Sequence, residues 1–234
     1  RTYAPMNDGR RQRCVELRTG HAHWIETDAY GNRVMVFTVE TWPPFATKVI
    51  SIDADLELRD EPASGKKGNL VDYLQPEPAM PFDKAVFKDQ SPMKRFAARL
   101  RTGGLIHQWV ADAVADAGYV KEDRGALYAL SEKRGDCTEY SSLFTALCRS
   151  RSIPSRRMGG YICNRNMRLT PLRFHNWSEF LEDGSWKLSD PQKRVLDRRY
   201  DRYVAMQVLG PEAGISRNRR FAVNSKSILV EMNP

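Results

Sequence analysis

Cys137 stands where its side chain could act as a nucleophile. It follows Asp136, a residue type that caps helix N-termini, and Glu139 completes an Asp-x-x-Glu capping box. The apolar residues from Tyr140 to Cys148 recur at helical spacing and predict a buried face. A thiol in the first turn of such a helix lies near the positive end of the helix dipole and near free backbone N–H groups. Both effects favour the thiolate, which is the nucleophilic form of cysteine.

A candidate base for this thiol lies in a predicted β-hairpin further along the chain. A single cysteine is more often a buried packing residue, so the presence of a partner decides its interpretation. The dipeptide Asp183-Gly184 between two strand patterns predicts a two-residue turn. Counting outward from that turn pairs Trp177 with Asp190, which makes His175 the diagonal neighbour of Asp190 on one face. A slip of one residue would place the two side chains on opposite faces.

An aspartate beside a histidine is the arrangement that a general base needs. The carboxylate fixes the tautomer and orientation of the imidazole and stabilises its protonated form. Cys137, His175 and Asp190 are therefore a candidate nucleophile, base and orienting residue. This chemistry requires the cysteine helix to meet the hairpin. We expect its first turn to face the side of the sheet that carries His175 and Asp190.

The composition is that of an ordinary globular protein with a basic surface. The 234 residues are 41% hydrophobic and 28% charged, with a net charge of +8. No apolar run approaches the ~18 residues of a membrane span, and no signal-peptide pattern is visible. Basic clusters occur at 198–202 and 217–220, but acidic residues are interspersed and no nucleic-acid motif appears. We expect neither nucleic acid nor membrane as a partner, and a preference for acidic partners stays open.

The cysteines indicate neither a metal site nor a disulfide framework. Cys14, Cys137, Cys148 and Cys163 form no C-x-x-C pair and no zinc-type spacing, so we expect no metal and no cofactor. One thiol has to stay free for chemistry, and the other three are expected to be structural. The sequence starts at Arg1 rather than Met, so its beginning does not reveal the compartment. A soluble protein is expected, and the free thiol favours the cytoplasm over secretion.

The pattern of secondary structure changes once along the chain. Strand-like segments fill the region from about 14 to 60, and a stretch rich in Gly and Pro follows at 61–81. We predict an N-terminal β-domain at 1–75 and a catalytic core at 76–234. In the core, helices are expected from Ser91, from 105 to about 118, at 126–130 and at the cysteine. Strands are expected at 119–120, 157–163, 174–181, 185–190, 203–209 and 227–231.

Several blocks of the core resemble the bacterial transglutaminase-like superfamily. They are Gly135–Arg156, Gly159–Tyr161, His175–Phe180 and Trp186–Pro191, and the segment Asp28–Leu58 is similar to the β-domain that often precedes such cores. The resemblance implies an α+β fold. Its papain-like core packs the cysteine helix on an antiparallel sheet, after a small antiparallel β-domain. It also supports the order of Cys137, His175 and Asp190 as the three catalytic positions.

The resemblance implies an acyl transfer through a thioester. Cys137 attacks a carboxamide carbonyl of a protein or peptide substrate, such as a glutamine side chain, while His175 acts as base and then acid. An amine acceptor gives transglutamination, whereas water gives deamidation or peptide hydrolysis. Calcium is not expected, because no acidic loop motif is present. A catalytically silent scaffold that serves as an interaction protein is the alternative.

Residues around the three positions have expected supporting roles. The backbone N–H of Cys137 is one candidate oxyanion donor, because helix N-termini present such groups. Tyr119, Gln108 and Trp109 are candidates for a second donor upstream. Trp177, on the same predicted face as His175, is a candidate for shielding the site from water. His107 is expected to be exposed or to cap a helix rather than to take part in catalysis.

Overall fold

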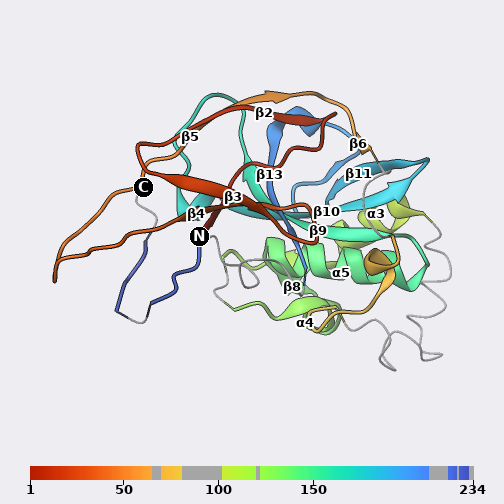
Figure 1. Cartoon of the computed structure of the whole chain (residues 1–234). Helices are drawn as coiled ribbons and strands as arrows, with labels where there is room; N and C mark the ends of the chain where they lie inside the picture. Colours follow the sequence, from red (N-terminus) through yellow and green to blue (C-terminus); the bar gives the residue numbers. More distant parts are fainter. Residues whose placement is uncertain (65–69, 81–101, 120–121, 211–220, 226, 232–234) are drawn as a thin grey trace.

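The computed structural model describes residues 1–64, 70–80, 102–119, 122–210, 221–225 and 227–231. Its centre is an antiparallel sheet in the order β12-β11-β10-β9-β13, with β6 paired to the outer part of β11. The strands are β6 (Ala63–Ser64), β9 (Ser155–Ile162), β10 (Phe174–Glu182), β11 (Ser185–Asp190), β12 (Val195–Leu196) and β13 (Tyr203–Leu209). Strands β10 and β9 occupy the middle, so the residues that β10 carries have neighbours on both sides (Figure 1).

Within the described residues, three helices form one buried layer against this sheet (Figure 1). They are α3 (Gly103–Ala113), α4 (Gly125–Glu132) and α5 (Cys137–Ser150). Their apolar faces form one buried cluster together with a side chain of β10; its largest members include Ile106, Val110, Leu143, Phe144, Leu147 and Phe180. Phe144 of α5 meets Phe180 of β10 edge to face at 5.8 Å between ring centres. The cysteine helix is therefore fixed on the sheet by apolar burial along its length.

The opposite face of β10 belongs to a second core. Side chains alternate between the two faces of a strand, so Trp177 points away from the helices when Ser178 points toward them. The Ser178 hydroxyl donates to the carbonyl of Ser141 on α5 at 3.0 Å. Trp177 instead packs edge-on against Tyr203 of β13, at 5.2 Å between ring centres, in a cluster with Trp186. Strand β10 thus separates a helical core from an aromatic core.

The hairpin of β10 and β11 has the predicted register. Glu182 pairs with Ser185, and the pairing continues outward to Ser178 with Ser189. Asp183 and Gly184 both have positive φ, 51° and 71°, as the turn of a tight two-residue hairpin requires. The prediction made from the Asp-Gly signal is confirmed.

The N-terminal strands form two small antiparallel sheets on the side of the main sheet away from α5 (Figure 1). One contains β1 (Thr2–Tyr3), β4 (Arg33–Phe37) and β3 (His23–Thr27), and the other pairs β2 (Gln12–Arg18) with β5 (Asp53–Leu58). Two buried amides join them to strand β13. Gln12 exchanges hydrogen bonds with the backbone of Ala205, both at 2.8 Å, and Asn32 does the same with Val208 at 2.9 and 2.6 Å. Side chains here satisfy the outer backbone groups of an edge strand.

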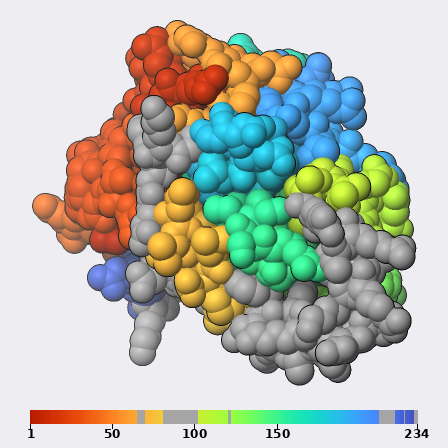
Figure 2. Space-filling model, turned by 90° about the vertical axis from the view of Figure 1, so that its right-hand side faces the viewer, coloured from red at the N-terminus to blue at the C-terminus, as the bar shows by residue number. Residues whose placement is uncertain are grey.

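The connection between the N-terminal strands and the helices runs along the surface of the core. Its described part reaches Met80 and includes the short helix η1 (Asp72–Leu74). Figure 2 shows this segment, in orange, beside the cyan β10–β11 hairpin and the green end of the helical layer. Arg149 of α5 holds it, donating to the carbonyl of Gln75 at 2.6 Å and pairing with Glu77 at 2.7 Å. The predicted division into 1–75 and 76–234 is not tested by these contacts and stays a prediction.

The predicted α+β class, with a cysteine helix on an antiparallel sheet, is confirmed. Three local differences stand out. The expected strand at 227–231 is wrong, and α3 ends at Ala113 rather than near 118. The expected strand at 119–120 is not found at Tyr119, and Val120 lies outside the described residues. Just upstream, β7 (Ala115–Asp116) pairs in parallel with β8 (Arg134–Gly135), which precedes the cysteine. The helix expected from Ser91 lies outside the described residues.

Within the described part of the chain, no helix has the length and apolar character needed to cross a membrane.

Candidate active site

Helix α5 begins at Cys137 through the predicted capping box. The N–H of Thr138 donates to the Asp136 carboxylate at 2.8 Å, and the N–H of Asp136 donates to Glu139 at 3.1 Å. Gly135 makes room for this arrangement, since a Cβ there would lie 2.3 Å from the Cβ of Glu139. Cys137 is half-buried and has no disulfide partner. The thiol therefore lies at a rigid helix start that water and ligands can reach.

His175 and Asp190 form a buried hydrogen-bonded pair. The distance from His175 Nε2 to Asp190 Oδ2 is 2.7 Å, and the two residues are 8% and 1% exposed. An ionised carboxylate only accepts, so Nε2 carries the proton and Nδ1 is the ring nitrogen left for another partner. Asp190 is itself held in place. The Tyr203 hydroxyl donates to the same Oδ2 at 2.9 Å, and the N–H of Lys193 donates to Oδ1 at 3.1 Å.

The surroundings of His175 favour its protonated form. Burial by itself lowers the pKa of this imidazole, but the hydrogen bond and charge of Asp190 raise it, followed by the hydrogen bond and charge of Cys137. The outcome is a pKa of about 9, above the usual 6.5. The contribution of Cys137 means that the thiol and the imidazole lie close enough to interact. Protonated imidazole beside a cysteine favours the thiolate, so the pair suits nucleophilic attack.

The position of Cys137 relative to His175 differs from the expectation that both lie on one face of the sheet. The first turn of α5 lies on the face of the sheet that carries Asn176, whose side chain donates to the Thr138 hydroxyl at 3.0 Å. His175 belongs to the alternate face, with Trp177, so the predicted common face is wrong. Cys137 is the first residue of α5 and His175 the second of β10. The two meet because both stand at the same end of the sheet.

The other candidate residues lie in different surroundings. Tyr119 is 80% exposed, and the Gln108 side chain donates to Asp112 one helical turn later at 2.7 Å. Trp109 packs against the helical core, with Lys133 Nζ at 4.8 Å from its ring centre. Trp177 is fully buried in the aromatic core. Their roles as oxyanion donors or as a water shield stay predictions, as do the catalytic roles of the three main residues.

His107 is buried, so the prediction that it is exposed or capping is wrong. It is 5% exposed, and its Nδ1 lies 2.9 Å from the hydroxyl of Ser189, the neighbour of Asp190. Burial lowers the pKa of His107 to about 4, although the charge of Asp190 acts in the other direction. His107 is thus neutral at physiological pH, in contrast to His175.

Three residues near the site were not identified from the sequence. They are Tyr203, which donates to Asp190, Asn176, which connects β10 to the first turn of α5, and His107 behind Ser189. Asn176 could have been found, because it directly follows His175 on a predicted strand. Tyr203 and His107 meet the site through strand and helix packing, for which the chain has no local signal.

The described residues contain no group of three or more His, Cys, Asp or Glu side chains arranged to hold a metal ion.

These features together define an α+β protein with a cysteine–histidine–aspartate constellation at a helix start. Residues 96–191 match the model of the transglutaminase-like superfamily, and this stretch includes Cys137, His175 and Asp190. The match supports the assignment of this part of the chain to the transglutaminase-like superfamily. No curated protein matches the chain.

One solved structure agrees with this fold. A candidate cysteine protease from Cytophaga hutchinsonii superposes with a TM-score of 0.61 at 17% identity, over 88% of this chain and 74% of that one. The periplasmic domain of TgpA from Pseudomonas aeruginosa is similar with a TM-score of 0.42 at 13% identity, over 82% and 67%. A red sea bream transglutaminase gives 0.30 at 15% identity, over 61% and 28%. The first likeness supports the fold alone, and the last two scores are too low to support any argument.

The match to this superfamily supports a cysteine-dependent activity in general. Which reaction the site performs, and which residues perform it, belong to the proposal that follows.

Proposed function

We propose that the protein is a cysteine-dependent acyltransferase or amidase that acts on carboxamides of proteins or peptides through a thioester. The observation that carries this proposal is the buried His175–Asp190 hydrogen bond of 2.7 Å at the end of the sheet where α5 begins with Cys137. A histidine whose pKa is raised to about 9, partly by Cys137 itself, is suited to act as the acid–base partner of the nucleophile.

The first half-reaction forms the thioester. The Cys137 sulfur bonds to the carbonyl carbon, and the oxygen becomes an oxyanion that the N–H groups at the start of α5 can stabilise. When the carbon–nitrogen bond breaks, His175 gives its proton to the departing amine. Asp190 keeps the imidazole oriented throughout and lowers the cost of its positive charge.

The second half-reaction releases the acyl group. An amine or a water molecule attacks the thioester and passes a proton to His175, and the carbon–sulfur bond breaks to restore the thiolate. An amine acceptor gives a new amide, whereas water gives a carboxylate. Both outcomes use the same three residues, so they differ only in what reaches the thioester.

A substrate screen with three parallel readouts tests the proposal. Ammonia release, amine incorporation and peptide cleavage are followed for the wild-type protein and for Cys137→Ala and His175→Ala. Each variant should lose at least about 10⁴-fold in rate while its circular dichroism spectrum shows that it keeps the native fold, since the residues act as a unit. Cys163→Ala, which removes a half-buried thiol near the same end of the sheet, is the matched control and should retain activity.

Thiol reactivity separates an enzyme from a silent scaffold. In the native protein, iodoacetamide should modify Cys137 much faster than Cys148, because complete burial raises the pKa of the Cys148 thiol well above its usual range. The reactivity of Cys137 should fall in His175→Ala. If both cysteines are modified equally slowly, Cys137 is not a nucleophile, and the protein is a catalytically silent scaffold.

A further inference from the structure

Two connections cross the end of the main sheet at which His175 lies. Residues 163–173 join β9 to β10, and residues 191–202 join β11 to β13 and include β12. The N–H of Cys163 donates to the carbonyl of Arg202 at 2.8 Å, so the two connections touch. Both begin or end within a few residues of the candidate catalytic groups. Both connections therefore lie at the end of the sheet where the candidate catalytic groups are found.

The two connections are strongly basic. Residues 163–173 contain three arginines and no acid, and residues 191–202 contain five basic residues and two aspartates. The basic residues are Arg165, Arg168, Arg173, Lys193, Arg194, Arg198, Arg199 and Arg202, and all eight are exposed. Arg194 is neutralised by Asp112, at 2.8 Å. Among the described residues, no acidic side chain forms an ion pair with any of the other seven.

The opposite end of the same sheet lacks this excess. Its two described turns are the one that joins α5 to β9, residues 151–154, and the Asp183-Gly184 turn. Together they hold one arginine and one aspartate. Among the described connections of this sheet, the positive charge is therefore greater at the end that carries His175.

These charges reach the groups around the site. Burial raises the pKa of Tyr203, which donates to Asp190, and the charge of Arg199 acts against that rise. Burial likewise raises the pKa of Cys163, and the charge of Arg173 acts against it. Each connection thus places a positive charge within electrostatic range of the same end of the sheet.

We propose that this basic end selects an acidic substrate, namely a peptide or protein segment in which the reactive carboxamide is flanked by Asp or Glu. This inference rests on the proposed function, for which it names the substrate class. Unpaired guanidinium groups bind carboxylates with two parallel hydrogen bonds, and a surface of one sign raises the encounter rate with ligands of the other. Leu172, which is 88% exposed next to Arg173, offers an apolar contact beside these charges.

A pair of small probes tests the local potential without any substrate. The rate at which Cys137 reacts with anionic iodoacetate is divided by its rate with neutral iodoacetamide, and both rates are read by mass spectrometry at that residue. In the variant Arg165→Gln/Arg168→Gln/Arg173→Gln this ratio should fall about threefold to tenfold at low salt. The control Arg13→Gln/Lys48→Gln/Arg59→Gln removes three exposed charges from the N-terminal region and should keep the wild-type ratio. An equal ratio in all three proteins overturns the inference.

Peptide selectivity is the second test. Glutamine peptides with Glu, uncharged or Lys flanks are compared by kcat/KM, and the acidic peptide should lead by at least about tenfold at low salt, less at high salt. The ratio of kcat/KM for the acidic peptide to that for the uncharged peptide should decrease in the variant that removes Arg165, Arg168 and Arg173. Equal turnover of all peptides overturns the inference but keeps the proposed function, whereas turnover of none contradicts the function. Stronger inhibition by a single-stranded oligonucleotide than by a Glu-rich peptide would assign the surface to nucleic acid.

Discussion

Strand β10 carries two buried acid–base groups on the same face, and they differ in what they can do. His175 near its start binds Asp190, and Glu179 further along binds Arg11 and Arg156. Both groups are nearly excluded from water. Arginine stays protonated at every pH a protein survives, whereas the imidazole can gain or lose a proton. One group can therefore only hold structure, and the other can also move protons.

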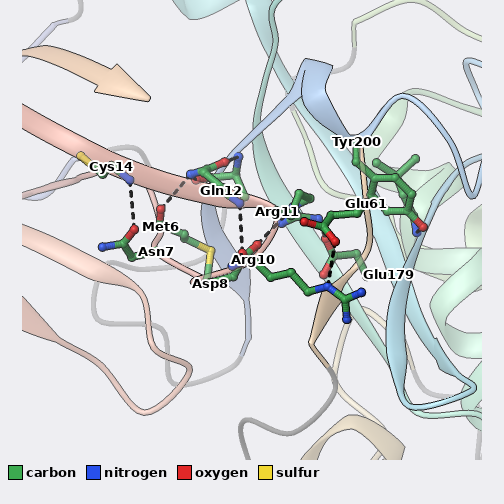
Figure 3. A network of polar contacts seen from close by, with 12 residues as sticks. Met6, Asn7, Asp8, Arg10, Arg11, Gln12, Cys14, Glu61, Glu179 and Tyr200 are labelled. Atoms are coloured by element: carbon green, nitrogen blue, oxygen red, sulfur yellow. Dashed lines mark hydrogen bonds and ion pairs between the residues drawn. The ribbon is translucent and has the colours of Figure 1, made fainter. Parts of the chain in front are cut away.

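The Glu179 group joins three separate segments. Its Oε1 accepts from Arg11, and its Oε2 accepts from Arg156 at 2.9 and 2.6 Å. Arg11 also pairs with Asp8 at 3.3 Å, and Arg156 lies over the ring of Trp186 at 4.2 Å. Figure 3 shows Arg11 and Glu179 within this network, with the exposed Arg10–Glu61 pair beside it. The carboxylate thus fixes the N-terminal segment to the sheet on which His175 lies.

The comparison shows how the same strand separates stability from reactivity. At Glu179 burial raises the pKa, but Arg11 and Arg156 outweigh it, so the pKa ends below its usual range. At His175 burial lowers the pKa, but Asp190 and Cys137 outweigh it, so the pKa ends above its usual range. Only the second group contains a thiol, and that thiol is partly exposed.

The largest expected effect comes from breaking the fixed group. Glu179→Ala should lower the free energy of unfolding by about 3–5 kcal/mol, because it leaves two buried guanidinium groups without their carboxylate. Urea unfolding followed by circular dichroism measures this change. Glu57→Ala is the control, because Glu57 pairs with Arg13 on the exposed surface. It should lower the free energy of unfolding by only about 0–1 kcal/mol. Similar losses in both variants would contradict the view that Glu179 holds the structure.

Much of the group formed by Cys137, His175 and Asp190 could be predicted from the sequence. The capping box before Cys137 and the Asp183-Gly184 turn are local signals, and each fixes the position of a candidate catalytic residue. The register of the hairpin then brings Asp190 next to His175 without knowledge of the rest of the fold.

The buried ion pairs around Glu179 could not be predicted, because they depend on contacts between segments that are distant in the sequence. Arg11 and Glu179 are 168 residues apart, and nothing near either residue signals the other. The same holds for His107, whose burial follows from the packing of α3 against β11. The sequence also could not predict which face of the main sheet α5 covers, because the apolar pattern of the helix fits either face.

A titration should separate the two groups at opposite ends of the pH range. The pKa of His175 is raised from 6.5 to about 9, so its contribution to stability is complete below pH 6.5 and is lost as pH rises through about 9. The pKa of Glu179 is lowered, so its contribution is present above the usual 4.5 and is lost on acidification. Activity should fall along with the first loss, because His175 no longer holds the proton that the departing amine needs.

Unfolding free energies and rates measured from pH 4 to 10 check this expectation. His175→Ala should flatten the alkaline fall in stability and leave the acid side unchanged. An unaltered alkaline slope in that variant would show that the imidazole is not the titrating group.

The smallest expected effect concerns Tyr203, which donates to the same carboxylate oxygen of Asp190 that accepts from His175. Tyr203→Phe keeps the ring in the aromatic core but removes one hydrogen bond, so stability should fall by about 1 kcal/mol and kcat by at most about tenfold. The negative charge of Asp190 is then less dispersed, which stabilises protonated His175 more strongly. The alkaline limb of the rate profile should move upward by less than about one pH unit.

A purely structural role for the Tyr203 hydroxyl would lower stability and leave that limb in place. Tyr161→Phe is the matched control, because Tyr161 is also buried but packs edge-on against Phe174, at 5.5 Å, and donates no hydrogen bond to Asp190 within the described structure. If both tyrosine variants keep the wild-type pH profile, Tyr203 belongs with Glu179 to the part of the molecule that only holds the fold. If only Tyr203→Phe moves the limb, the aromatic core takes part in setting the proton affinity of His175.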